Sequence, residues 1–501
     1  MSELNIEAVP LKKENSETLL NEPFYTKYIR ENYLYFALLS LGFGLFYTFC
    51  LYKNLSGITF PVFVSGTLLC LYLASRKMQL PWERNSLIYL PVMLFIGIST
   101  CLTDNSFFHV CNILALFLLT WVFIIRQFYR DKHWDFERYF FNFIRCAFTS
   151  IGCLPLPFIH FSSFRKTKTG KNPQIAYIAL GALIAVPLLC VILSLLINAD
   201  AAFAYFIDKT FGQLFFDSSW IQIILMIGIG FLLFYSCLCG VSRLNLAGEN
   251  ANSKKWPASL GMTILLLLTF VYLVFCCVQI IVLFSHGAMI LPKDYTYAQY
   301  ARQGFFELLY VSIINLIIVF IWLSKFQEHL GLKAVLSMFC GCTFFLIGSS
   351  AYRMILYIRE YDLTFLRILV LWFLCLLFLL ILGVIITIYK RNFPLFRYCI
   401  VVVTALYMGL LCMRTDSLIM RYNLSRQETI TLSDIYYYTD LSADAAPYIA
   451  GIDLKQIEAE DADYAQEILS NYFKNLNQDP GIRTFNFSRA RAARIAAEYL
   501  R

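Results

Sequence analysis

The chain has 501 residues, of which 59% are hydrophobic and only 15% are charged, and its mean hydropathy is +0.64. This composition excludes a soluble enzyme, a disordered chain and a collagen-like chain. The net charge of +8 comes from Lys and Arg residues that lie mostly in short segments between apolar runs. Such placement is typical of helix orientation in a bilayer, so we expect no nucleic-acid partner.

The first 32 residues are too polar and acidic for a secretory signal, and we interpret residues 1–32 as a cytoplasmic tail. Eleven apolar windows of the length that a helix needs to cross a bilayer follow, with an error of about one. Four lie in a first membrane unit, residues 33–125, and seven in a second, residues 175–413. The windows are Tyr33–Tyr52, Ile58–Ser75, Ser86–Leu102, Phe107–Ile125, Ile175–Ile197, Trp220–Cys239, Leu260–Phe284, Phe305–Leu323, Ala334–Tyr352, Ile368–Tyr389 and Leu395–Met413. The predicted fold is all-α and polytopic.

Residues 126–174 separate the two units and differ from both in composition. This segment is rich in aromatic residues, is interrupted by Pro155 and Pro157, and ends in a basic run. An amphipathic segment with a basic end is held at a membrane surface by apolar burial and by attraction to anionic lipid. We predict a cytoplasmic interfacial connector, either a hinge between the units or a lipid-binding site.

Lys and Arg are concentrated in alternate loops, which by the positive-inside rule places the amino terminus in the cytoplasm. An odd number of spans then places residues 414–501 outside the cytoplasm, and an even number reverses that tail. We predict the tail to be a small domain of helices over Leu424–Tyr438, Leu454–Leu476 and Ser488–Leu500. Asp453 and Ser488 are the expected caps of the last two helices.

Several sequence motifs occur in an order that is typical of one protein family. They are NADAAFAYF after the fifth window, TYAQYARQGFFELLYV from Thr296, SAYRMILYIREYDLTFLRI from Ser350, LSADAAPYI from Leu441, and FNFSRARAARIAAEYL near the end. With these motifs, residues from about 175 to 501 resemble a bacterial multi-pass inner-membrane family that is known only as a domain of unknown function. The resemblance implies the membrane of a bacterium and no particular reaction.

On the predicted topology, several polar and aromatic residues share the extracytoplasmic side and form a candidate ligand or partner site. We expect Glu307 and Arg353 to form an ion pair between helices, and the carboxylates of Asp200, Asp362 and Asp416 to bind a cation or relay a proton. The alternative is that these charges only orient helix ends and that the tyrosines form an ordinary interfacial belt. The candidate residues are Asp200, Tyr297, Tyr300, Arg302, Glu307, Tyr352, Arg353, Tyr357 and Asp362.

Motifs for catalysis or for a cofactor are missing. The sequence contains no Walker-type phosphate loop, no His-Glu-x-x-His zinc motif, no Gly-x-Ser-x-Gly elbow and no Cys-x-x-Cys pair. The 16 cysteines lie almost wholly in apolar windows, where thiols pack as small hydrophobic groups. We therefore expect no cofactor and no metal.

Three functions remain open. The leading one is a non-catalytic envelope sensor or accessory subunit, whose partners are the lipid bilayer and a membrane or envelope protein. The alternative is a secondary transporter of a small solute, which the span number allows and Pro187 in the fifth window favours. The third is a lipid or cell-wall transferase with an outer carboxylate as base and with Arg302 and Arg353 holding a phosphate.

Overall fold

The structure is a computed structural model that describes residues 23–54, 56–80, 82–128, 136–169, 219–244, 255–284, 305–390, 392–453, 456–457, 461–477 and 481–501, with some positions between 192 and 209. Within these ranges every regular element is a helix, and the β pairing consists of two isolated bridges. The helices are α2 (Phe24–Glu31), α3 (Tyr33–Leu51), α4 (Thr59–Lys77), η2 (Arg84–Ser86), α5 (Tyr89–Leu102), α6 (Ser106–Phe128), α7 (Phe136–Gly152), α8 (Leu156–Thr169), α11 (Ser219–Arg243), α12 (Ala258–Phe284), α14 (Phe305–Lys325), α15 (Leu330–Tyr361), α16 (Phe365–Tyr389), α17 (Leu395–Cys412), α18 (Thr415–Leu424), α19 (Leu432–Asp440), η3 (Ala443–Ala445), α20 (Ala446–Ile449), α21 (Ala462–Leu476), η5 (Ile482–Thr484) and α22 (Phe487–Tyr499).

Nine of the described helices, α3, α4, α6, α11, α12 and α14 to α17, are long and apolar enough to cross a membrane. Each coincides with one of the eleven predicted windows, so the all-α polytopic membrane fold is confirmed. The third predicted window contains a shorter helix of 14 residues, because η2 ends at Ser86 and α5 starts only at Tyr89. The fifth window, Ile175–Ile197, lies outside the described residues except for isolated helical positions.

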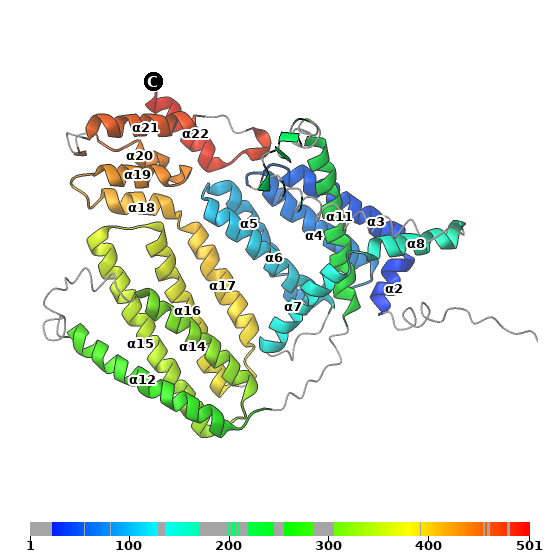
Figure 1. The fold of residues 1–501 in the computed structure, drawn as a ribbon, viewed down its shortest axis with the longest axis horizontal. Helices are drawn as coiled ribbons and strands as arrows, with labels where there is room; N and C mark the ends of the chain where they lie inside the picture. The colour runs from blue at the N-terminus through cyan, green and yellow to red at the C-terminus, as the bar shows by residue number, and fades with distance from the viewer. Residues whose placement is uncertain are drawn as a thin grey trace, which may run out of the picture.

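The membrane helices form two units that stand side by side (Figure 1). In the first unit, α2 to α6 pack together with α11, and α12 and α14 to α17 form the second. The predicted boundary assigned α11 to the second unit, but this helix packs mainly on α3. Gly44 of α3 and Gly230 of α11 meet there, and a Cβ atom at Gly230 would lie 2.8 Å from the Gly44 Cα. The two backbones approach this closely because neither residue has a side chain.

At one end of the helices, α7 joins the two units, and α8 packs on α2, α3 and α11 of the first unit. We call this end the N-terminal face, because α3 starts there and α14 ends there. Glu137 of α7 forms an ion pair with Lys325 at the end of α14, and Tyr139 stacks on Phe396 at the start of α17 with ring centroids 3.9 Å apart. At the other end of α7, Ser150 packs against Gly240 of α11. The predicted connector therefore links helices of both units, and its two helices are bent by 52° relative to each other.

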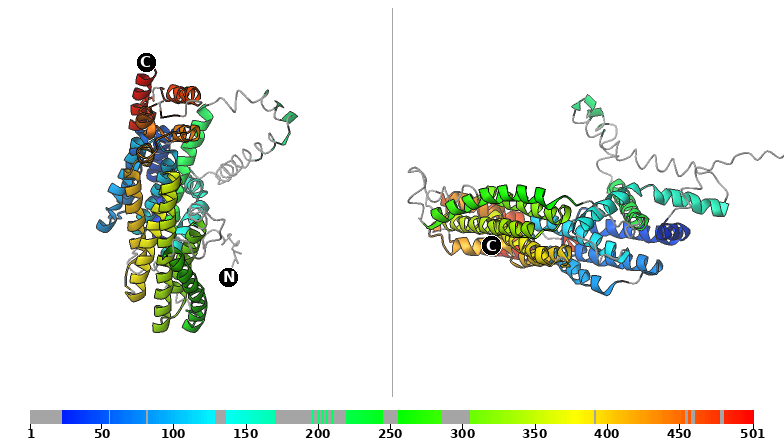
Figure 2. Two further views of the ribbon diagram at one scale, coloured as in Figure 1. Left: turned by 90° about the vertical axis from the view of Figure 1, so that its left-hand side faces the viewer. Right: turned by 90° about the horizontal axis from the view of Figure 1, so that it is seen from below.

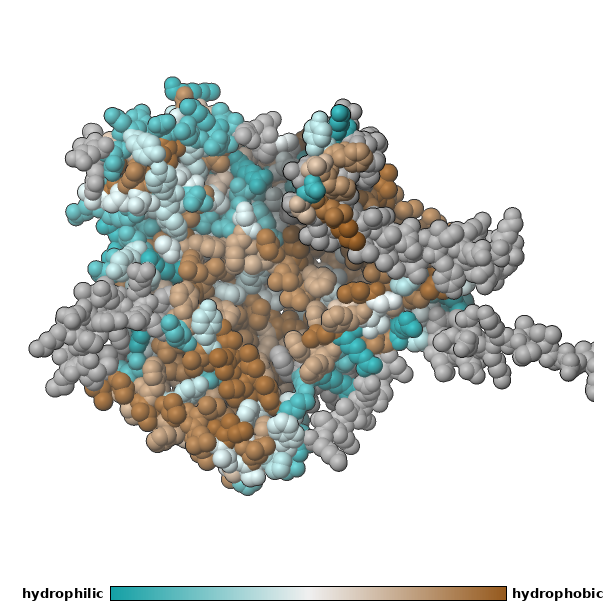
Figure 3. Space-filling view, viewed as in Figure 1, coloured by the Kyte–Doolittle hydropathy of each residue, from teal (hydrophilic) through white to brown (hydrophobic). Residues whose placement is uncertain are grey.

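Residues 414–501 form a helical C-terminal domain at the opposite end of the membrane helices, which we call the C-terminal face (Figure 2). Hydrophilic residues dominate its surface, whereas hydrophobic residues cover the helices beneath it (Figure 3). The domain has a core of its own, with Met420, Ile435, Tyr438, Leu469 and Phe473 all buried. A small domain gains stability from such a core and from the surface on which it docks.

The helices of this domain start at other residues than predicted. The first predicted helix, Leu424–Tyr438, covers the last residue of α18, the loop after it and most of α19. Thr431 caps α19 in a reciprocal bond with Asp434. The next, α21, starts at Ala462 and not at Leu454. The cap of α22 is Asn486, which accepts bonds from the backbone of Ser488 and Arg489, so the prediction of Ser488 as the cap was wrong.

Candidate site beneath the C-terminal domain

The C-terminal domain is bonded to the loop between α3 and α4. Asn54 donates from Nδ2 to the Arg483 carbonyl at 2.9 Å, and the Ile58 backbone N–H donates to the Phe485 carbonyl at 3.0 Å. In the other direction, Arg483 donates from Nη2 to the carbonyls of Phe49 and Tyr52 at 2.8 and 3.0 Å. The two bonds from Arg483 satisfy carbonyl groups at the end of α3 that have no partner within the helix. This loop thus binds residues more than 400 positions away in the sequence.

The loop between α5 and α6 carries the most polar part of the interface. Asn486 is fully buried, and its Nδ2 donates to the carbonyls of Thr100 and Thr103 at 3.0 and 2.8 Å. Arg489, one turn further along α22, donates from Nε to Asp104 Oδ1 at 2.6 Å. A charge-assisted bond of this length is among the stronger hydrogen bonds in proteins. The start of α22 is therefore fixed on the end of α5.

Two more carboxylates face this loop from the C-terminal domain. Asp416 of α18 is 2% exposed, and its oxygens accept from Asn105 Nδ2 at 3.2 and 3.0 Å and from the Ser442 backbone N–H at 3.2 Å. The Ser442 hydroxyl also donates to Asp416. Asp444 of η3 accepts at Oδ2 from the Thr103 hydroxyl at 2.5 Å. We call Asp104, Asp416 and Asp444 the acidic cluster.

Burial sets the electrostatics of the acidic cluster. It raises the pKa of Asp416 above its usual value, although bonds from Ser442 and Asn105 lower that pKa in part. Burial also raises the pKa of Asp104, and this rise exceeds the lowering effect of Arg489. Burial, followed by the charges of all three carboxylates, raises the pKa of the Tyr472 phenol. Tyr472 therefore lies near the whole cluster and stays protonated.

Two polar side chains next to the acidic cluster have no hydrogen-bond partner among the described residues. His109, in the first turn of α6, is 8% exposed, and neither of its ring nitrogens has a partner. Its charged neighbours are Arg489 and Asp444. The buried hydroxyl of Tyr472 has no partner either. Buried polar atoms without partners are rare, and they occur where a protein binds water, a proton or a ligand.

A second polar group lies one turn deeper, at the junction of the two membrane units. Asn112 of α6 is fully buried; it donates to the Ser99 hydroxyl of α5 at 2.9 Å and accepts from the Tyr407 hydroxyl of α17 at 2.6 Å. His109 and Asn112 are three positions apart on α6, so they share one helix face. Polar residues therefore continue from the acidic cluster into the membrane helices.

Replacing Tyr407 by Phe removes the bond between the two membrane units. The buried Asn112 carbonyl then loses a donor, which costs on the order of 1–2 kcal/mol of unfolding free energy. We expect a lower thermal unfolding midpoint for Tyr407→Phe in detergent than for Tyr310→Phe, since the Tyr310 side chain is 61% exposed. Equal midpoints for the two variants would show that this bond does not stabilise the junction.

The loop between α15 and α16 brings two of the predicted site residues together. Arg367 stacks on the Tyr357 ring, with its guanidinium 4.2 Å from the ring centroid, and donates to the Asp362 carbonyl. The Asp362 carboxylate accepts from Gln427 at 2.8 Å, and Asn423 bonds both backbone groups of Leu363 at 2.9 and 3.0 Å. Through this loop the C-terminal domain contacts the second membrane unit.

The other predicted residues do not join this loop or the acidic cluster. Tyr297, Tyr300 and Arg302 lie outside the described residues. Asp200 is exposed and caps the backbone of Ala202 and Phe203. Tyr352 is 39% exposed on α15, and Glu307 is exposed at the start of α14.

Arg353 is buried and donates to Gln279 Oε1 of α12 at 2.8 Å. The expected pairing of Glu307 with Arg353 is not among the ion pairs of the described residues.

Sequence reasoning missed Asp104, His109, Asp444 and Arg489 and named only Asp416 of the cluster. A signal for the first two is present: a polar run, Thr103 to Asn105, joins two apolar windows, and a histidine follows one turn into the second window. A buried histidine inside an apolar window is uncommon, which makes this position a candidate for a functional site.

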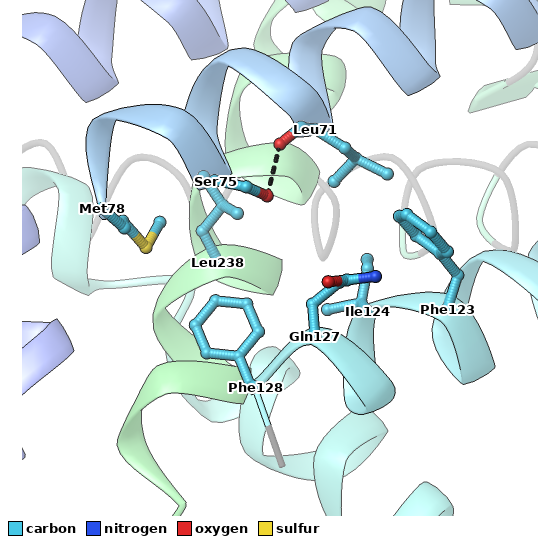
Figure 4. A pocket seen from close by; sticks show the side chains of 8 residues that line it. All are labelled: Leu71, Ser75, Met78, Phe123, Ile124, Gln127, Phe128 and Leu238. Atoms are coloured by element: carbon cyan, nitrogen blue, oxygen red, sulfur yellow. Dashed lines mark hydrogen bonds between the residues drawn. The ribbon is translucent and has the colours of Figure 1, made fainter. Parts of the chain in front are cut away.

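No group of three His, Cys, Asp or Glu side chains in the described part of the chain is arranged to hold a metal ion. A cavity of about 10 Å³ lies elsewhere, lined by Leu71, Ser75, Met78, Phe123, Ile124, Gln127, Phe128 and Leu238 (Figure 4). The Ser75 hydroxyl is bonded to the Leu71 carbonyl at its edge. This volume holds about one water molecule.

Comparison with known proteins gives one family. A family model described as "Domain of unknown function (DUF4153)" matches residues 90–452, a range that starts in α5 and ends after α20. No curated protein and no solved structure matches the chain. The matched range includes Asp104, His109, Asp416 and Asp444, so the acidic cluster lies within the region that defines the family.

Proposed function

Because this integral membrane protein belongs to the family with the DUF4153 domain of unknown function, whose description names no reaction, we propose its role from the contacts of its C-terminal domain. We propose a non-catalytic envelope sensor or accessory subunit. Its C-terminal domain docks on the loops of the membrane helices and leaves them when a ligand, a partner or a stress favours the undocked arrangement. The bilayer and a membrane or envelope protein are its proposed partners.

The observation that carries this proposal is that one small domain binds both membrane units. Arg483 and Asn486 bind loops of the first unit, and Asn423 binds the α15–α16 loop of the second. On the N-terminal face, α7 joins the same two units. A change in docking therefore changes the restraint on both units at once, and α7 is the element that responds on the other face.

The distribution of basic residues supports an extracytoplasmic C-terminal domain. Arg76, Lys77, Arg243, Lys325 and Lys390 lie at helix ends on the N-terminal face. By the positive-inside rule that face is cytoplasmic, and the domain then lies outside the cytoplasmic membrane of a bacterium.

Protease protection in spheroplasts tests both the sidedness and the change in docking. We expect proteinase K to cleave the C-terminal domain slowly in unstressed spheroplasts and severalfold faster under osmotic or cell-wall stress. Arg483→Gln removes the bonds to Phe49 and Tyr52, so this variant is expected to be cleaved fast without stress. Arg491→Gln is the matched control, because Arg491 is an exposed residue on α22.

Two results contradict the proposal. Equal cleavage of the wild type under every stress would remove the sensor role. Cleavage in inverted vesicles but never in spheroplasts would place the domain in the cytoplasm and overturn the proposed sidedness.

A further inference from the structure

The base of the C-terminal domain carries the most exposed apolar side chains of that domain. Ile482 of η5 is 90% exposed and Phe487 at the start of α22 is 56% exposed, more than any other large apolar side chain in the described part of the domain. Elsewhere the surface of the domain is mainly hydrophilic (Figure 3). Apolar side chains gain free energy by leaving water, so two of them in one short segment point to an apolar neighbour at this place.

The contacts of Arg483 fix the depth of Ile482 relative to the membrane helices. Arg483 donates to the carbonyls of Phe49 and Tyr52, and its guanidinium lies 5.8 Å from the centroid of the Phe49 ring. Phe49 is in the last turn of α3, a helix that is long and apolar enough to cross a membrane. Ile482 directly precedes Arg483 in the chain, so it lies close to the level at which α3 leaves the bilayer.

The rest of the segment lies on the neighbouring helix ends. A Cβ atom at Gly57, in the loop between α3 and α4, would be 2.9 Å from the Thr484 carbonyl carbon. Asn486 binds two carbonyls at the end of α5. The rings of Phe485 and Phe487, on either side of Asn486, meet edge to face with centroids 5.1 Å apart. The segment that carries both exposed side chains therefore runs over the ends of α3, α4 and α5.

Residues of the first membrane unit continue this apolar surface and add basic groups to it. Phe49 is 62% exposed, and Ile58, whose backbone N–H donates to the Phe485 carbonyl, is 43% exposed. Lys53 and Arg483 are the exposed basic residues beside them. Apolar side chains bordered by cations match the order of a phospholipid leaflet, in which the acyl chains lie beneath negatively charged phosphates.

We propose that Ile482 and Phe487 insert into the phospholipid leaflet next to α3, α4 and α5, so that the bilayer holds the base of the C-terminal domain. Lys53 and Arg483 lie at the level of the lipid phosphates. This inference deepens the proposed function and rests on it, because it names the partner that favours the docked arrangement. Lipid is the neighbour that these contacts favour over a protein, because the exposed side chains lie at the ends of membrane helices whose outer surface is apolar.

Photocrosslinking identifies the neighbour of each exposed side chain directly. The photoreactive residue p-benzoylphenylalanine is introduced in place of Ile482 or of Phe487 in the full-length protein, in vesicles of phosphatidylethanolamine and phosphatidylglycerol. We expect irradiation to give protein that is heavier by the mass of a phospholipid. The matched control is the same replacement at Leu500, an exposed residue at the other end of α22, where the chain ends on the side of the domain away from the membrane helices (Figures 1 and 2). We expect no lipid adduct there.

A double variant measures how much the lipid contact contributes to docking. Ile482→Ser combined with Phe487→Ser removes both apolar groups and leaves the bonds of Arg483 and Asn486 in place. We expect hydrogen exchange at the start of α22 to be about five- to tenfold faster in this variant than in the wild type, both in nanodiscs of the same lipids and after normalisation to intrinsic exchange. Leu500→Ser is the matched control and is expected to exchange as the wild type does.

The proposed lipid contact is overturned if neither position gives a lipid adduct, or if the double variant exchanges at the wild-type rate. A crosslink from both positions to protein alone would overturn it in favour of a protein partner. If stress still exposes the domain to protease in these cases, only the lipid contact fails. If lipid adducts form as expected but no stress changes the exposure of the domain, the lipid contact stands and the proposed function fails.

Discussion

Gly44→Ala is expected to destabilise the first membrane unit, because the added methyl group would collide with the backbone of α11. A Cβ atom at position 44 would lie 2.5 Å from the Ile227 carbonyl oxygen and 3.0 Å from the Phe231 backbone nitrogen. Both atoms belong to the main chain, so no side-chain rotation removes the clash. The two helices must move apart, which we expect to cost about 1–3 kcal/mol of unfolding free energy.

The matched control is two residues away on the same helix. A Cβ atom at Gly42 meets no other atom within 4 Å. Alanine has the higher helix propensity, so Gly42→Ala is expected to be neutral or more stable by up to about 1 kcal/mol. Thermal unfolding of both variants in one detergent, followed by intrinsic fluorescence, measures the two effects. If Gly44→Ala unfolds at the same temperature as Gly42→Ala, the close crossing of α3 and α11 does not hold the first unit together.

The membrane helices could be predicted from sequence because the cost of exposing backbone and polar groups to lipid depends on local composition. Windows such as Leu260–Phe284 therefore coincide with helices such as α12 almost residue for residue. The packing partner of a helix depends on distant residues instead. The order of the chain places α11 after the connector, in the second unit, but Gly44 and Gly230 pair it with α3 of the first.

The acidic cluster could not be found in the same way. Asp104 and Asp444 are 340 positions apart, and each is an ordinary loop or turn residue in its own sequence context. Asp362 and Tyr357, two of the predicted site residues, are separated only by a helix turn and a short loop, and Arg367 contacts both. Local spacing in the sequence therefore identifies side chains that lie together within one loop. Side chains that come together only when a domain docks can be identified only from the three-dimensional structure.

Asn486 shows why the sequence placed the cap of α22 at the wrong residue. Ser488 and Asn486 are both good capping residues, and the local pattern does not distinguish them. Docking decides between them, because Asn486 can cap the helix with its Oδ1 and bind the loop carbonyls of Thr100 and Thr103 with its Nδ2. A serine lacks the second group.

Asn486→Ala is expected to have the largest effect on docking of any single side-chain truncation in the interface. It removes the cap of α22, worth about 1 kcal/mol, and leaves two loop carbonyls without this donor, worth about 1–3 kcal/mol more. Asn486→Asp separates the two contributions, because aspartate still caps the helix but cannot donate and adds a negative charge near Asp104. We expect hydrogen exchange at the start of α22 to rise at least tenfold in both variants, and the helicity of an isolated α22 peptide to fall only in Asn486→Ala.

Asn477→Ala is the control, since Asn477 is an exposed asparagine at the end of α21 in the same domain. If Asn486→Asp leaves exchange at the wild-type rate while Asn486→Ala raises it, then Asn486 acts as a cap alone, and the bonds to the α5–α6 loop do not hold the domain. If both raise exchange at α22 but not in α21, the domain opens at this loop first while its own core, with Leu469 and Phe473, stays folded. That local opening is the movement on which the proposed sensor depends.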